Sequence, residues 1–186
     1  MIVFFDFETG GVNDEAPEIQ LAAVAVDKDW KELGVFEEKI AFEKSKCSVE
    51  ALELNHYDPD LWKDAKPPHV VVELFARFIN PFKAVQMVSK RTGKPYMVAR
   101  LAGHNVSTFD MPRLRRMFGT AFMPADPRAL DTLQRALWYA QETGNVPDNF
   151  RLETLCKHFG LEAIGAHDAL ADVRMSISLA RFFGGK

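Results

Sequence analysis

The chain has 186 residues, of which 47% are hydrophobic and 26% are charged. This length suits one domain and this balance is globular, which excludes a disordered or collagen-like chain. The net charge of −3 gives no bulk electrostatic argument for nucleic-acid binding. A protein whose carboxylates hold metal ions can still bind phosphates through those ions. We therefore expect one globular domain over residues 1–186.

Other features of the chain bear on its cellular location. The longest uncharged apolar stretch, Ile19–Val26, is too short to span a membrane. No basic segment precedes the apolar run after Met1, so we expect no secretory signal. Cys47 and Cys156 give neither a disulfide framework nor a zinc-binding spacing. These features predict a cytoplasmic protein with no membrane partner.

Strand-like segments open the chain. Ile2–Thr9 is rich in β-branched and aromatic residues and ends at Gly10. A second apolar run covers Ile19–Val26, and Val35–Phe42 alternates apolar with charged residues. The short connections between these segments predict an antiparallel meander of three strands.

Helices and strands alternate in the rest of the chain. We expect strands over Met97–Ala102 and at Leu130–Thr132, while Lys83–Lys94 has no clear pattern. The expected helices are Ser48–Asn55, Val70–Ile79, Phe109–Phe118, Leu133–Gln141, Leu152–Phe159 and Ala169–Phe183. This order predicts the α/β class, with a mixed sheet covered by helices.

Two acidic residues, Asp6 and Glu8, lie inside the most apolar strand. Because residues two apart on a strand share a face, their carboxylates point together. Like charges on a buried strand are costly unless a cation joins them, and divalent ions prefer oxygen ligands. The alternative is a strand end that reaches water, where both side chains are solvated.

A second polar cluster, His104–Asp110, follows the predicted strand Met97–Ala102. Sites in open α/β sheets form at the carboxyl ends of strands, which favours a functional role. The alternative is structural, because Ser107 and Asp110 have the spacing of a capping box.

The third cluster contains His167 and Asp172, at the start of the last predicted helix. On one continuous helix, residues five apart point about 140° away from each other. If Asp168 caps the helix, His167 precedes it and can fold back toward Asp172, where an imidazole can carry a proton. The alternative is a solvated loop histidine, with Asp172 favourably placed near the helix N-terminus.

Taken in order, these clusters resemble the motifs of the DEDDh family of 3′-to-5′ exonucleases, whose fold is RNase H-like. Asp6–Thr9 is similar to the first motif, His104–Asp110 to the second and His167–Asp172 to the third. The resemblance covers Ile2 to about Phe183.

The resemblance implies a catalytic set of four carboxylates and one histidine, which are Asp6, Glu8, Asp110, Asp172 and His167. The four carboxylates are implied ligands of two divalent metal ions, Mg²⁺ or Mn²⁺. Asp6, Glu8 and Asp172 would serve the ion that activates water. Asp6 and Asp110 would serve the ion at the leaving oxygen. His167 would take the proton from the attacking water.

The resemblance also implies a pocket for the 3′ nucleotide. It places this nucleotide against the backbone amides of Thr9 and Gly10, with Val12 and Phe109 near the base and Asn105 near the backbone. Gly10 replaces the usual second threonine of the family, and Val12 replaces a leucine that acts as a wedge against the terminal base. Because valine is smaller than leucine, we expect Val12 to hold the terminal base less tightly.

The implied function is a metal-dependent 3′-to-5′ exonuclease that releases nucleoside monophosphates from single-stranded DNA. One alternative is an exoribonuclease that trims RNA or short oligonucleotides. Another is a proofreading or nucleic-acid-binding module with little free activity, for which a polymerase or a second copy of the chain would be a partner.

Basic residues form two groups that could guide an incoming strand. They are Lys90, Arg91, Lys94 and Arg100, and then Arg113, Arg115 and Arg116. A solvated helix face is the commoner meaning of such runs.

Overall fold

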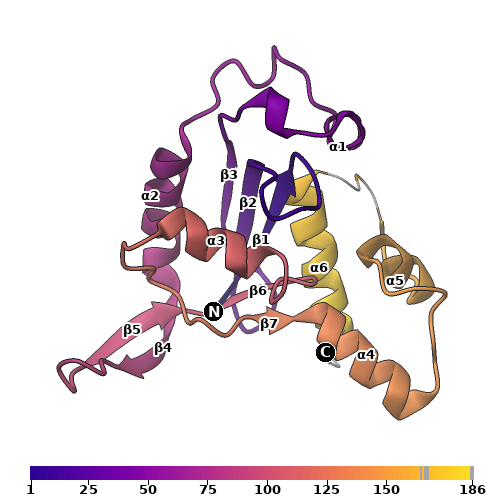
Figure 1. The fold of residues 1–186 in the computed structure, drawn as a ribbon. Helices are drawn as coiled ribbons and strands as arrows, with labels where there is room; N and C mark the ends of the chain where they lie inside the picture. The colour runs from indigo at the N-terminus through magenta and orange to yellow at the C-terminus, as the bar shows by residue number, and fades with distance from the viewer. Residues whose placement is uncertain (164, 166–167, 185–186) are drawn as a thin grey trace.

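A computed structural model describes residues 1–163, 165 and 168–184 of the chain. Its centre is a five-stranded sheet in the order β3-β2-β1-β6-β7, with helices on both faces (Figure 1). The strands are β1 (Ile2–Thr9), β2 (Glu18–Val26), β3 (Glu32–Lys39), β6 (Leu101–Gly103) and β7 (Leu130–Asp131). β1, β2 and β3 pair antiparallel, whereas β6 and β7 join in parallel. The predicted α/β class and the opening meander are confirmed.

The remaining elements lie around this sheet and beside it (Figure 1). The helices are α1 (Val49–Leu54), α2 (Pro68–Ile79), α3 (Asp110–Phe118), α4 (Thr132–Thr143), α5 (Leu152–His158) and α6 (Ala169–Phe183), with short 3₁₀ turns η1 (Lys44–Lys46) and η2 (Asn80–Phe82). A separate two-stranded sheet consists of β4 (Lys83–Val88) and β5 (Pro95–Ala99). No helix in the described part of the chain is long and apolar enough to cross a bilayer.

The alternation of β1 sorts its side chains between two cores. Phe5 and Phe7 are buried on the face covered by α2 and α3. Phe4 lies on the other face, where it packs with Val173 and Ile177 of α6. Asp6 and Glu8 share the parity of Phe4, so the strand presents both carboxylates toward α6.

The third strand starts and ends earlier than the predicted Val35–Phe42. Asp27 accepts backbone N–H bonds from Asp29 and Lys31, which closes a tight turn and lets pairing restart at Glu32. At the other end, Ile40 still donates its N–H to the carbonyl of Ile19 in β2 at 2.8 Å, but it lies outside β3 and forms an isolated bridge with Lys66. The alternation of apolar and charged residues in this strand was predicted correctly, but the bounds of the strand depend on the turn at Asp27.

The predicted strand Met97–Ala102 is two strands that belong to different sheets. Residues up to Ala99 pair with β4, and residues from Leu101 pair with β1. Arg100 stands between them, and its carbonyl accepts the N–H of Val3 at 2.9 Å. The segment Lys83–Lys94, which had no clear pattern, supplies β4 and the turn of this hairpin.

Candidate active site

Three carboxylates from two elements meet at one point. Asp6 and Glu8 come from β1, and Asp172 comes from the first turn of α6. Each offers one oxygen atom, and these oxygens all lie within 4.8 Å of one another. Because α6 packs directly on β1 and β2, the helix delivers Asp172 to the face that carries the other two carboxylates.

A fourth carboxylate, Asp110, enters from the first turn of α3 and is only 2% exposed. Its Oδ1 accepts the backbone N–H of Phe7 at 3.2 Å, so the side chain is tied to the strand between Asp6 and Glu8. The capping-box alternative is wrong, because α3 begins with no side-chain cap. The N–H of Ser107 instead donates to Asp131 at 3.0 Å.

Burial and mutual repulsion raise the pKa values of this cluster. Burial raises the pKa of Asp6 well above its ordinary value, and the charges of Asp110, Glu8 and Asp172 add to the effect. Burial also raises the pKa of Glu8 to about 8, again assisted by Asp172. Burial raises the pKa of Asp110 to about 8, although the N–H of Phe7 opposes the shift.

This electrostatic arrangement fits divalent metal ions. Close carboxylates that hold protons near neutral pH lack the positive charge that would let them ionise together. A divalent cation supplies that charge, and carboxylate oxygens are its preferred ligands. Asp6, Glu8 and Asp172 can therefore hold such an ion, and Asp110 is hydrogen-bonded to β1 beside them.

His167, the predicted proton carrier, lies outside the described residues. The next residue along the chain, Asp168, is the N-cap of α6, and its Oδ1 accepts the N–H of Ala171 at 3.1 Å. The predicted capping role of Asp168 is confirmed.

The residues predicted to meet the 3′ nucleotide include the loop after β1. The Thr9 hydroxyl donates to the carbonyl of Gly11 at 2.8 Å, and the N–H of Gly10 donates to the carbonyl of Pro17 at 2.8 Å. A Cβ at Gly10 would lie 2.3 Å from Cys47 Sγ, which explains glycine at this position. The Gly10 amide is thus engaged within the loop. Val12 is 91% exposed and free of the core.

Asn105 and Phe109 occupy the turn that leads into α3. Asn105 has φ of 55°, a left-handed conformation that asparagine tolerates better than most residues. Its N–H donates to Asp131 at 3.0 Å, and its Oδ1 accepts the Thr108 hydroxyl at 2.6 Å. The Phe109 ring stacks under the guanidinium of Arg113 at 3.8 Å. Both predicted contact residues are therefore held in fixed positions.

A cleft of about 700 Å³ joins Asp172 to Asn105. Its lining contains residues that sequence patterns did not identify, including the apolar Leu54, Leu133 and Phe150 and the basic Arg151. These residues come from α1, α4 and the segment before α5, so only the tertiary fold brings them together.

His104 fixes one wall of this cleft. Its Nδ1 lies 3.0 Å from the Thr132 hydroxyl, and its Nε2 lies 3.0 Å from the carbonyl of Phe150. Burial lowers the pKa of His104, and its ring joins Thr132 at the start of α4 to the loop before α5.

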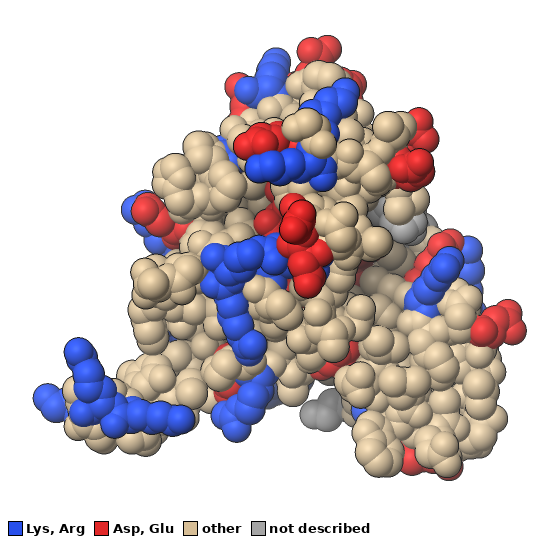
Figure 2. Space-filling model, in the orientation of Figure 1, with Lys and Arg blue, Asp and Glu red and all other residues tan. Residues whose placement is uncertain are grey.

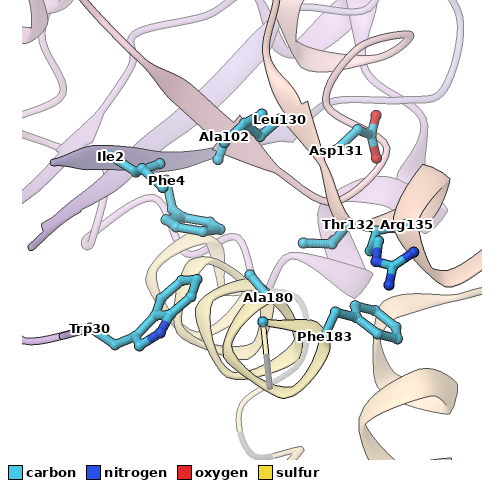
Figure 3. A pocket seen from close by; sticks show the side chains of 11 residues that line it. Ile2, Phe4, Trp30, Ala102, Leu130, Asp131, Thr132, Arg135, Ala180 and Phe183 are labelled. Atoms are coloured by element: carbon cyan, nitrogen blue, oxygen red, sulfur yellow. The ribbon is translucent and has the colours of Figure 1, made fainter. Parts of the chain in front are cut away.

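A second pocket, of about 310 Å³, lies near the start of β1 (Figure 3). Phe4, Trp30 and Ala180 surround it, with Asp131 and Arg135 to one side (Figure 3). None of the four predicted catalytic carboxylates lines this pocket, so it is separate from the carboxylate cluster.

The arginines predicted to guide a strand are largely engaged within the protein. Arg113 is 2% exposed and donates to the carbonyls of Phe109 and Asn13, so a guiding role for it is wrong. Arg116 pairs with Glu18 at 2.6 Å. Arg100 pairs with the fully buried Asp126 at 3.1 Å.

Comparisons with known proteins find nucleases that are similar to this chain. The family model RNase_T, described as exonuclease, matches residues 96–180. The *Arabidopsis thaliana* protein NEN3 is 32% identical over 82 residues, which are 44% of this chain and 16% of NEN3.

Solved structures share the fold over nearly the whole chain. *E. coli* exonuclease I in complex with a dT13 oligonucleotide has a TM-score of 0.73 and 22% identity, covering 97% of this chain and 40% of that one. Cell-death related nuclease 4 has a TM-score of 0.73 and 16% identity, covering 99% of this chain and 63% of that one. The chain thus spans about two fifths of exonuclease I. The predicted resemblance is confirmed: residues 96–180 carry an exonuclease-family match, on the RNase H-like fold of exonuclease I.

Proposed function

We propose that the chain is a metal-dependent 3′-to-5′ exonuclease domain that releases nucleoside monophosphates from single-stranded DNA. The carboxylate cluster is the observation that carries this proposal. Asp6, Glu8 and Asp172 place oxygens within 4.8 Å of one another, and Asp110 is tied to the same strand. Such a cluster is electrostatically costly without cations, and phosphodiester cleavage is chemistry that such cations serve.

The four carboxylates would hold two divalent ions, Mg²⁺ or Mn²⁺. When bound, such ions neutralise phosphate charge and lower the pKa of water. The contribution of the chain is a rigid set of oxygens, because β1 fixes Asp6 and Glu8 while the Phe7 N–H fixes Asp110. A zinc-bound form of *E. coli* exonuclease I with single-stranded DNA is among the similar structures, which supports metal use.

His167 would accept the proton of the attacking water. Its position in the sequence supports this role, because it directly precedes the cap of the helix that carries Asp172. Imidazole has an unperturbed pKa near neutrality, which suits it to taking and releasing protons at physiological pH.

The cleft beside Asp172 suits a single strand. Leu54, Leu133 and Phe150 offer apolar surface to bases, and Arg151 offers a cation to phosphate. Similar structures hold exonuclease I with dT13 and dA16 oligonucleotides, which supports single-stranded DNA as the substrate.

Digestion of matched substrates tests this function. With Mg²⁺ or Mn²⁺, linear single-stranded DNA with a free 3′ hydroxyl should yield mononucleotides. Circular DNA and 3′-phosphorylated DNA should resist digestion, and a chelator should stop the reaction. Rapid cutting of the circle would show an endonuclease, whereas faster digestion of an RNA of the same sequence would reassign the substrate.

A further inference from the structure

The hairpin formed by β4 and β5 is unusually basic for this chain. Segment 83–100 contains five of the 23 basic residues and none of the 26 acidic ones. The rest of the chain therefore has 18 basic residues against 26 acidic residues. The hairpin forms its own sheet and extends away from the central one (Figure 1). It is thus a positive arm on an acidic protein.

The turn of the hairpin presents three cations to solvent. Lys90, Arg91 and Lys94 are all exposed. The Ser89 N–H donates to the carbonyl of Lys94 at 3.0 Å, and the Gly93 N–H donates to that of Ser89 at 2.8 Å. Gly93 has φ of +69°, which glycine adopts without strain. Backbone hydrogen bonds therefore close the turn, which places the three cations together at the tip of the hairpin.

The three cations at the hairpin tip differ from Arg100 and Arg116 in their ion pairing. Among the described residues, no carboxylate lies within ion-pair distance of Lys90, Arg91 or Lys94, whereas Arg100 and Arg116 are paired. Figure 2 shows the blue side chains of the hairpin at the lower left, with further blue side chains between them and α3. Their charge is thus available to an external anion.

The base of the hairpin is fixed to the body of the protein. β5 runs directly into β6, and the ring of Tyr96 contacts that of Phe122 at 5.9 Å. Along β4 the side chains alternate between half-buried and exposed, so one face of the hairpin packs inward. The base of the arm is therefore anchored to the body of the protein.

The tip lies far from the carboxylates. The hairpin joins the sheet at Leu101, which is opposite Val3, and Glu8 is five residues further along β1. At about 3.3 Å per residue, that separation is about 17 Å before the length of the hairpin is added. A strand bound at its 3′ end by the carboxylates could meet the tip only several nucleotides upstream.

We propose that Lys90, Arg91 and Lys94 bind the sugar–phosphate backbone of the nucleic acid upstream of the 3′ end, independently of sequence. This inference rests on the proposed function, and it adds a second contact outside the cleft. Exposed, unpaired Lys and Arg side chains are typical phosphate ligands, and phosphate contacts position a strand without reading its bases. The arm offsets the negative charge of the rest of the chain.

Salt-dependent binding tests the arm. The variant is K90Q/R91Q/K94Q, and the matched control is K31Q/K63Q/R181Q, which removes three exposed cations outside the hairpin. Affinity for a fluorescent single strand of about 30 nucleotides is measured in chelator over roughly 50 to 200 mM salt. Each phosphate contact contributes about 0.7 to the slope of log affinity against log salt. The hairpin variant should lose about 2 from this slope, which is about 16-fold over that salt range, while the control keeps the wild-type slope.

A second readout separates the arm from the active site. Hydrolysis of the p-nitrophenyl ester of thymidine monophosphate should be unchanged in the hairpin variant, and melting curves should confirm that it folds. An unchanged slope, or an equal loss in the control, would overturn the proposal. If the hairpin variant kept its DNA binding but lost its binding of polyglutamate, the arm would instead be a binding site for an acidic protein.

Failure of the proposed exonuclease function would give a different experimental result from failure of the proposed arm. The binding assay needs no cleavage, so an inactive wild-type protein whose slope still depends on the hairpin would contradict the exonuclease proposal alone. An active enzyme whose slope ignores the hairpin would contradict the arm alone.

Discussion

Asp6 has three other carboxylates as electrostatic neighbours, and together with burial they raise its pKa. We expect Asp6→Ala to abolish cleavage without unfolding the protein, because it removes a proposed metal ligand and also relieves repulsion. Loss of a direct ligand should cost more than the roughly 10–100-fold that follows loss of a group that only orients one. Activity assays with thermal melts in chelator check this, and near wild-type cleavage would contradict the metal-site assignment.

His167 and Asp168 are adjacent in sequence but have different expected roles. We expect His167→Ala to lose roughly 10²–10⁴-fold in rate with metal affinity kept, because it removes only a proton acceptor. Asp168→Ala should instead cost about 1 kcal/mol of stability, because Asp168 caps α6.

Single-turnover rates, metal titrations and melts of the two variants separate these roles. Full turnover of His167→Ala, or loss of its metal binding as complete as that of Asp172→Ala, would refute the proton-carrier role.

Local periodicity predicted part of the site. Strand alternation put Asp6 and Glu8 on one face, and capping by Asp168 placed Asp172 in the first turn of α6. The role of Asp110 could not be decided from local spacing, because its partner, the Phe7 N–H, is 103 residues away. The family resemblance, not the periodicity, joined these residues into one site.

At the scale of elements, Asp131 connects the loop before α3 to α4. Its carboxylate accepts the N–H groups of Asn105, Ser107 and Leu133, each at 3.0 Å. We expect Asp131→Ala to destabilise the protein by about 2 kcal/mol, because three amides lose a charged acceptor.

The same change should reduce cleavage, because Asn105 lines the cleft. Asp131→Asn is the matched control. Its carbonyl oxygen can still accept from Asn105 and Leu133, so it should lose less stability. Chemical denaturation of both variants measures the difference, and equal stability of Asp131→Ala and wild type would rule out this connecting role.

Other elements show what can and cannot be predicted from sequence patterns. Met97–Ala102 forms one continuous pattern, yet it divides at Arg100 because its two halves pair with different strands. The β4 segment had no clear pattern because its hairpin packs on one face only and carries a basic turn. The helix Ala169–Phe183 was predicted with its observed bounds because its cap and apolar stripe are both local signals.

At the scale of the whole molecule, the carboxylate cluster should make stability depend on pH. The pKa of Glu8 is about 8 in the folded state against an ordinary 4.5, so the native protein binds more protons than the unfolded chain between these values. Without metal, the free energy of unfolding should therefore fall from about pH 5 to about pH 8 and then level off.

Divalent metal should reverse this trend, since ions that bind only the native state stabilise it and compete with protons. Melting temperatures across this pH range, in chelator and in Mg²⁺ or Mn²⁺, measure both effects. Glu8→Gln should make the profile in chelator less steep, because it removes one of the three carboxyl groups whose pKa burial raises. A profile that metal leaves unchanged would argue against a carboxylate metal site.

These carboxylates are proposed to serve hydrolysis that begins at a 3′ end. The most direct measurement is a time course with a 5′-labelled single-stranded oligonucleotide and Mg²⁺, resolved to single nucleotides. We expect a ladder of labelled products that shortens one nucleotide at a time. Immediate release of labelled mononucleotide, or labelled fragments of random length from the first time point, would contradict it.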